Sequence, residues 1–113
     1  MAIEHLTDSE RDAERRSRMA RALATGGFED VLVTDRATAR KVLTPKRQEL
    51  IARIRAGEIE SVRALATDLD RDVSGVSRDL DLLFEADIVE FETEGRRKIP
   101  RLKHDTVVVE PIT

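Results

Sequence analysis

The stretch Ser61–Leu83, SVRALATDLDRDVSGVSRDLDLL, constrains the fold of this chain more than any other segment. Apolar residues recur at helical spacing on both sides of a polar break, the segment 70–72. The apolar positions are Val62, Leu65, Ala66 and Leu69 before the break, and Val73, Val76, Leu80 and Leu83 after it. Ser61 is a suitable N-cap for the first helix. The pattern predicts two short helices joined by a tight turn.

The second helix would direct a polar face away from its apolar stripe. At 100° per residue, Ser74 and Arg78 lie roughly opposite the stripe, with Gly75 and Ser77 on the flanks. Two helices joined in this way form a helix-turn-helix, whose second helix can enter the major groove of DNA. There Arg78 would bond a guanine, the serines would meet bases or phosphates, and Gly75 would permit close backbone approach. A solvated helix surface remains the alternative for either serine.

The segment that follows predicts a hairpin. Residues 89–92 alternate between apolar and acidic, as in a half-buried strand, and Glu94-Gly95 suits a turn. Residues 96–103 hold five positive charges and no acid, and Pro100 predicts an edge strand. We expect the cations Arg96, Arg97 and Lys98 at the tip to contact the DNA backbone, with a solvated charged hairpin as the alternative.

The remaining segments complete an α+β fold. Helices are predicted over 8–24, after Asp35 and over 45–56, and strands over 28–34 and 106–110. Helix, helix, turn, helix and hairpin, in this order, make a winged helix-turn-helix domain, placed over residues 28–113. Residues 1–27 then form an N-terminal helical extension, which we interpret as a dimerisation element because its apolar seam is narrow.

Composition excludes several classes of function. The chain has no Cys, Trp or Tyr, so its core must be aliphatic and thiolate metal sites are ruled out. His5 and His104 lack the spacing of a metal pair, and no Gly-rich phosphate loop or nucleophile–base arrangement is present. No apolar run is long enough to span a bilayer. We therefore expect a cytoplasmic protein that is not an enzyme, has no cofactor and does not bind membranes.

The overall charge of the chain says more about its source organism than about its binding partners. The net charge is −3, and 16 of the 20 basic residues are Arg. Such a composition, acidic and poor in aromatics, resembles that of proteins from salt-loving archaea. In a halophile a general acidity says little about nucleic-acid binding, so the local distribution of charge is the better guide.

Residues 61–91 resemble the DNA-binding core of small prokaryotic winged-helix regulators of the MarR and ArsR type. The preceding LTPKRQELIARIRAG is similar to the first helix of an archaeal subgroup, and EGRRKIPRLKHDTVVVEPI to its wing and final strand. The resemblance spans roughly Leu43 to Ile112. Where these families often carry Gly, this chain has Asp70 and Asp87, and aspartate tolerates a left-handed backbone better than most residues.

The resemblance implies a set of contact residues. Base contacts map to Ser74, Gly75, Ser77 and Arg78. Backbone contacts map to Arg71, Arg96, Arg97 and Lys98, with Arg47 as a further candidate. The expected function is a homodimeric transcriptional regulator that binds double-stranded DNA sequence-specifically. The sequence identifies no small-molecule effector.

Two other functions stay open. An acidic helix surface with an exposed Leu82 favours a winged-helix protein–protein interaction module within a larger complex. RNA binding is the third, and the sequence offers it no aromatic stacking platform.

Overall fold

The computed structural model describes residues 7–28 and 30–110, and within them it has five helices and four strands. In chain order they are α1 (Asp8–Thr25), β1 (Val31–Thr34), α2 (Arg36–Val42), α3 (Pro45–Ala56), α4 (Val62–Asp68), α5 (Val73–Glu85), β2 (Val89–Glu94), β3 (Arg97–Leu102) and β4 (Thr106–Val109). The predicted helices and strands are confirmed, except that the strand predicted over 28–34 begins only at Val31 and the strand predicted over 89–92 continues to Glu94.

Four helix starts are fixed by local capping. A side-chain oxygen of the residue before the helix accepts a hydrogen bond from the backbone N–H three residues later, which satisfies one otherwise unpaired donor. The capping residues are Thr7, Asp35, Thr44 and Ser61. Because these contacts involve only neighbours in the chain, the sequence alone could predict them.

Two aspartates occupy the left-handed backbone region, as their positions predicted. Asp70 has a φ of 51° after α4, and Asp87 has a φ of 62° between α5 and β2. In the hairpin, Gly95 has a φ of 62° at the first position of a two-residue turn. These residues let the chain reverse direction sharply between packed elements.

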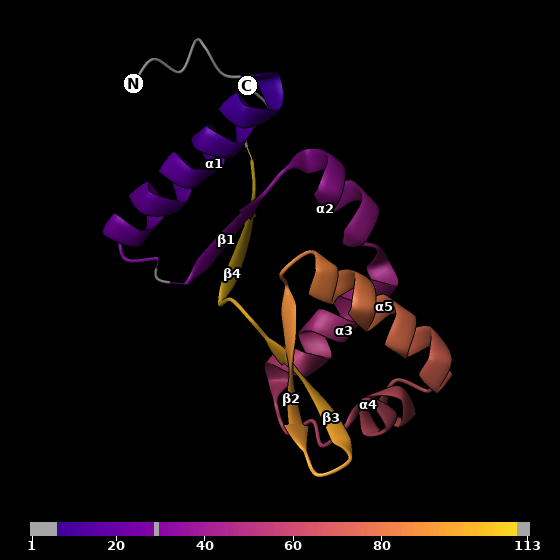
Figure 1. Ribbon diagram of the computed structural model, residues 1–113. Helices are drawn as coiled ribbons and strands as arrows, with labels where there is room; N and C mark the ends of the chain where they lie inside the picture. The colour runs from indigo at the N-terminus through magenta and orange to yellow at the C-terminus, as the bar shows by residue number, and fades with distance from the viewer. Residues whose placement is uncertain (1–6, 29, 111–113) are drawn as a thin grey trace.

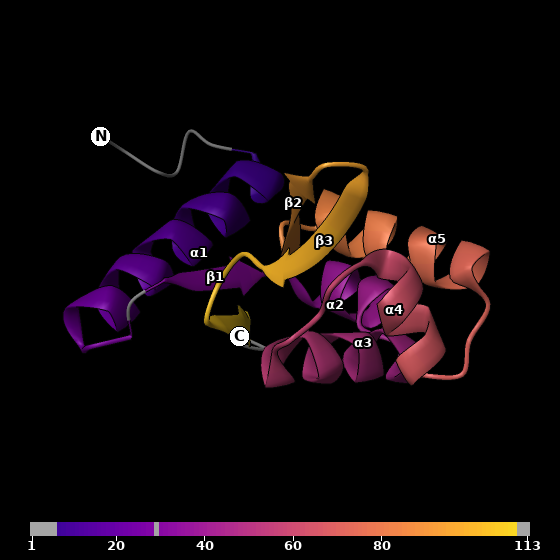
Figure 2. The same cartoon turned by 90° about the horizontal axis from the view of Figure 1, so that it is seen from below.

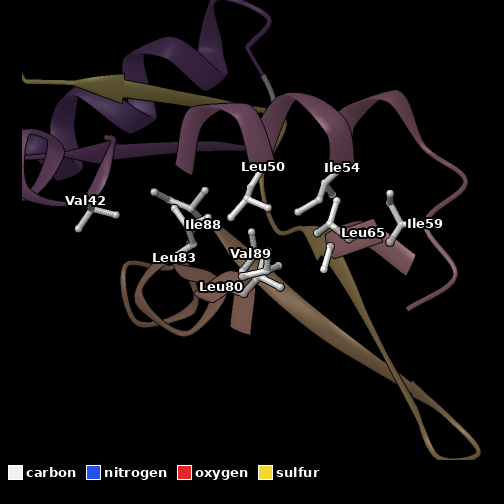
Figure 3. Packing of buried hydrophobic residues seen from close by; sticks show 11 residues of the cluster. Val42, Leu50, Ile54, Ile59, Leu65, Leu80, Leu83, Ile88 and Val89 are labelled. Atoms are coloured by element: carbon white, nitrogen blue, oxygen red, sulfur yellow. The ribbon is translucent and has the colours of Figure 1, made fainter. Parts of the chain in front are cut away.

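The core lies where α3, α4 and α5 meet (Figure 3). Leu50 from α3, Leu65 from α4, and Leu80 and Leu83 from α5 are each 0–1% exposed. Ile88 and Val89 close the cluster at the start of β2. Every large side chain in this cluster is aliphatic, as the scarcity of aromatics required.

The hairpin of β2 and β3 lies beside α5 (Figure 1). The strands are antiparallel, with Phe91 opposite Pro100 and Glu94 opposite Arg97. Within the described residues β3 pairs with β2 alone, so Pro100 lies on an edge strand as predicted. Together, α3, α4, α5 and this hairpin form a winged helix-turn-helix, with the hairpin as the wing.

A second lobe projects from this domain (Figures 1 and 2). β1 and β4 form a two-stranded parallel sheet in which Leu32 lies opposite Val107, and α1 packs on β1. The chain measures 50 × 27 × 23 Å, and its radius of gyration of 16.2 Å exceeds the roughly 13 Å of a spherical domain of this length. The sequence predicted both strands but not their pairing. The division at residue 27 stays a prediction.

The buried stripe of α5 is tested by two leucines of the same helix. Leu80 is 1% exposed, and Leu82 is 36% exposed. We expect Leu80→Ala to lower the free energy of unfolding by about 2–5 kcal/mol, because it leaves a cavity in the core. Leu82→Ala should change it by no more than about 0.5 kcal/mol. Urea unfolding followed by circular dichroism measures both, and equal losses would contradict the orientation of α5.

Candidate nucleic-acid interface

The N-terminal half of α5 presents a short polar surface to solvent. Ser74, Ser77 and Arg78 are exposed, whereas Val76 on the opposite side is fully buried. The hydroxyl of Ser74 donates a hydrogen bond to the carboxylate of Asp72, and this bond lowers the pKa of Asp72. The helix face predicted for base contacts is therefore turned outward, and its small side chains leave room for close approach.

Gly75 lies on the flank of this face, against the side chain of Arg71. A methyl group at Gly75 would lie 3.7 Å from Arg71 Nη2, which is ordinary van der Waals contact. Glycine is therefore not required by crowding. Since it costs about 1 kcal/mol relative to alanine inside a helix, its presence calls for another reason.

Asp79 joins three elements through two ion pairs. Its carboxylate accepts a hydrogen bond from Arg71 Nη2 at 2.7 Å and another from Arg47 Nε at 3.1 Å. The three side chains are only 16–18% exposed. Arg47 Nη1 also donates to the carbonyls of Lys41 and Val42, at 3.1 and 3.3 Å. These bonds tie the N-terminal end of α3 to α5 and to the turn before it.

The ion pairs also determine the protonation of Asp79. Burial raises the pKa of its carboxyl, but the hydrogen bonds and charges of Arg71 and Arg47 outweigh burial and hold the pKa below its ordinary value. The sequence predicted that both arginines contact the DNA backbone. In the structure both are paired with Asp79, and their contact with DNA stays a prediction.

The wing carries the other predicted cations. Arg96, Arg97 and Lys98 are exposed, and Arg97 forms an exposed ion pair with Glu94 at 3.2 Å. Lys98 Nζ lies 4.0 Å from the ring centroid of Phe91, in a cation–π contact. Within the described residues Arg96 has no ion-pair partner.

An aromatic pair beside the wing escaped the sequence interpretation. Phe84 from α5 stacks on Phe91 from β2, with ring centroids 5.6 Å apart and planes inclined by 17°. Phe84 remains 48% exposed. The sequence did not predict this stack, because the fold brings together two rings that are seven residues apart. The absence of an aromatic platform for stacking RNA bases stays a prediction. This pair and Lys98 fix the wing against the C-terminal half of α5.

Of the two histidines considered as metal ligands, only His104 lies within the described residues. His104 Nδ1 lies 3.0 Å from Asp30 Oδ1, whereas His5 falls outside the described residues. The described part of the chain holds no cluster of three or more His, Cys, Asp or Glu residues that could bind a metal. None of the described helices combines the length and apolar character needed to cross a bilayer.

A known protein family matches most of this domain. The profile of the HVO_A0114 family matches residues 42–109, which is more than half of the 113-residue chain. The chain belongs to the HVO_A0114 family. The part matched by the HVO_A0114 profile runs from the end of α2 to the end of β4, and it leaves out α1 and β1. No curated protein matches the chain.

A solved structure shares the fold of this HVO_A0114 family member. It is the solution NMR structure of the homodimeric winged helix-turn-helix DNA-binding domain of Mb0332 from Mycobacterium bovis, a possible ArsR-family transcriptional regulator. The TM-score is 0.56 at 26% sequence identity, and the match covers 61% of this chain and 64% of that one. The chain therefore matches less than two thirds of that domain.

The paired carboxylate predicts a pH-dependent stability. At neutral pH, we expect Asp79→Asn to lower the free energy of unfolding by about 1.5–3 kcal/mol, the range for hydrogen bonds to charged groups. The pKa of Asp79 is lower in the folded state than the roughly 3.9 of an unfolded chain. Its contribution is therefore complete above about pH 4 and is lost as the pH falls through the folded-state pKa.

Urea unfolding of the wild type and Asp79→Asn at several pH values tests this. The difference between them should shrink as the pH falls below about 4. Asp81→Asn is the control, because Asp81 lies exposed on the same helix. A difference that is the same at every pH would show that the charge of Asp79 is not what stabilises the fold.

Proposed function

We propose that this protein is a transcriptional regulator that binds double-stranded DNA in a sequence-specific manner. α5 would enter the major groove, and the wing would lie along the adjacent backbone. The observation that carries the proposal is the exposed N-terminal half of α5, where Ser74, Ser77 and Arg78 face away from the core. A similar fold is described as a DNA-binding domain in the mycobacterial protein. We further propose that the protein has no catalytic activity and that it is located in the cytoplasm.

Arg78 would be the residue that reads a base in the major groove. Its guanidinium is exposed on the outer face of α5 and makes no ion pair within the described residues, so it is available for a guanine. Ser74 and Ser77 are short, so they would let the helix approach the floor of the groove. The MarR and ArsR type of regulator and an archaeal, halophilic source are inferred from the resemblance and from the Arg-rich, acidic composition.

Selection of preferred duplexes from a random pool tests the base reading. We expect the wild type to enrich a defined sequence, and Arg78→Ala to lose about 1–3 kcal/mol of discrimination at one base pair. Binding of Arg78→Ala to unrelated duplexes should fall far less. If Arg78→Ala enriches the same sequence as the wild type with the same preference, α5 does not read bases through this residue.

We also propose that the protein acts as a homodimer through the lobe of α1, β1 and β4. None of the described residues of α1 is buried, although it is 18 residues long. β1 and β4 pair only with each other among the described strands, which leaves one unpaired edge on each. Parallel sheets this small are rarely stable unless they are covered. The similar mycobacterial domain is described as homodimeric.

The selection experiment also tests the dimer. A two-fold dimer should enrich a pseudo-palindrome with half-sites about one helical turn apart. Light scattering of the free protein should then give twice the chain mass of 12.8 kDa. A single unsymmetrical site together with a monomeric mass would contradict the dimer but leave DNA binding intact.

The wing is tested by removing its charge. We expect the triple variant Arg96→Ala, Arg97→Ala and Lys98→Ala to weaken binding to all duplexes and to make it less dependent on salt, because fewer counterions are released. The control removes three exposed cations outside the wing and the dimer lobe, through Arg40→Ala, Lys41→Ala and Arg55→Ala. Fluorescence anisotropy at several salt concentrations measures both. Equal losses in the two variants would remove the wing from the interface.

A second function is favoured by one surface. Leu82 is 36% exposed and Phe84 is 48% exposed, and the acidic Asp81 and Glu85 lie next to them. Apolar and acidic side chains together suit a protein partner better than a phosphate backbone. If the wild type binds no duplex even in low salt, we propose the protein–protein module in place of the regulator.

A further inference from the structure

One edge of the small sheet in the lobe carries main-chain groups without partners. Among the described strands β4 pairs with β1 alone, and just beyond β4 the N–H group of Glu110 donates to the C=O group of Thr34 at 2.8 Å. Successive residues of a strand direct their main-chain groups to opposite edges, so Val107 and Val109 direct theirs away from β1. Beyond the pair with β1, no main-chain hydrogen bond of the described chain involves either residue.

The free edge of the wing is protected against pairing with another chain, whereas that of β4 is not. Charged side chains and proline on an edge strand prevent such pairing. β3 has three cations and Pro100 among its six residues. β4 consists of one threonine and three valines, which are residue types that favour strands. The chain therefore protects one edge and leaves the other open.

Of the two free edges of the lobe, that of β4 is the more accessible. α1 packs on β1, and all four residues of β1 are half-buried. β4 ends in Val109, whose side chain is 41% exposed. A sheet of two strands is marginally stable by itself, and three or more strands with an apolar face are needed for independent stability. We therefore expect a further strand beside β4.

The same strand of a second copy fits this edge. If two β4 strands run antiparallel around a twofold axis at Val108, each Val107 lies opposite the partner's Val109. These are the residues whose N–H and C=O groups point outward, so each such pair exchanges both of its hydrogen bonds. A shift by one residue would oppose groups that are already bonded to β1. The edge is thus complementary to itself in the register that uses every outward-pointing group of the strand.

We propose that β4 pairs antiparallel with β4 of a second copy, with Val108 of each chain at the twofold axis. The two lobes then share one sheet of four strands, in the order β1-β4-β4-β1. This inference rests on the homodimer proposed above, to which it adds the strand, its direction and its register. The two winged helix-turn-helix domains would be joined through main-chain hydrogen bonds rather than through side chains alone.

The same pairing brings together the two large apolar side chains that the lobe exposes. Phe28 precedes β1 and is 56% exposed, whereas Val109 ends β4. Because β1 and β4 are parallel, these residues lie at opposite ends of the sheet within one chain. An antiparallel partner places the Val109 end of one lobe beside the Phe28 end of the other. Each end of the joint sheet therefore gathers apolar side chains from both copies.

Single cysteines test the pairing, because the chain has none of its own. At the twofold axis the Cα atoms of the two Val108 residues would lie about 4.5 Å apart, which suits a disulfide. We expect Val108→Cys to form a disulfide-linked dimer on mild oxidation of the full chain, as seen by non-reducing electrophoresis. The matched control is Val33→Cys, which lies opposite Val108 on β1 and is also half-buried. Its two copies would be three strand spacings apart, about 14 Å, and should not cross-link.

The main-chain hydrogen bonds are tested by a proline at the exposed end of the strand. Val109→Pro removes one outward N–H group from each copy and leaves the groups that face β1 in place. We expect the dissociation constant of the dimer to rise at least about tenfold, since two hydrogen bonds are lost. Val109→Thr keeps the N–H group and the branched shape, so it should dimerise nearly as the wild type does. Sedimentation equilibrium measures both variants.

The outcomes separate this inference from the proposals on which it rests. A dimer in which Val33→Cys cross-links, or in which neither cysteine variant does, would overturn the β4 pairing and leave the homodimer intact. Equal dissociation constants for Val109→Pro and Val109→Thr would also overturn the pairing. A monomeric wild type would overturn both the pairing and the homodimer. Cross-linking of Val108→Cys alone, in a protein that selects no duplex, would support the pairing and reject the regulator.

Discussion

Burial of one aliphatic stripe of α5 against α3 and α4 sets the geometry of the whole interface. Val76, Leu80 and Leu83 are 0–1% exposed, and each contributes about 1.5–3 kcal/mol when removed from water. An exposed ion pair contributes at most about 1 kcal/mol. The stripe therefore decides how the helix is rotated about its axis. Once the stripe faces inward, Ser74 and Arg78 must face outward, because they lie on the opposite side of the helix.

Ion pairs refine this geometry and also distribute the charge. The chain is acidic overall, and several of its cations are paired within the fold: Arg47 and Arg71 with Asp79, Arg97 with Glu94, and Lys103 with Asp87. Three cations without an ion pair in the described residues, Lys46, Arg78 and Arg96, lie around the start of α5 and at the tip of the wing. A net charge of −3 therefore does not prevent a locally cationic surface.

The sequence predicted best what depends on neighbours in the chain. The caps of α1, α2, α3 and α4, the left-handed aspartates and the exposure of Ser74 all follow from local spacing. Contacts between distant segments were not predictable in this way. The stack of Phe84 on Phe91 needs the wing to fold back on α5, and Arg47 reaches Asp79 across 32 positions. The parallel pairing of β1 with β4 joins segments about 75 residues apart.

By itself, then, the sequence determined the order of the elements, the buried faces of α4 and α5 and the identity of the candidate contact residues. It did so because helical and strand periodicity decide which side chains can be buried together. Only the tertiary structure decided which contacts those residues make. In it, Arg47 and Arg71 pair with Asp79, one donor of Arg71 has no acceptor among the described residues, and Lys46 lies beside Gly75. Such assignments depend on distances in space between segments, and a one-dimensional pattern of residue types does not contain them.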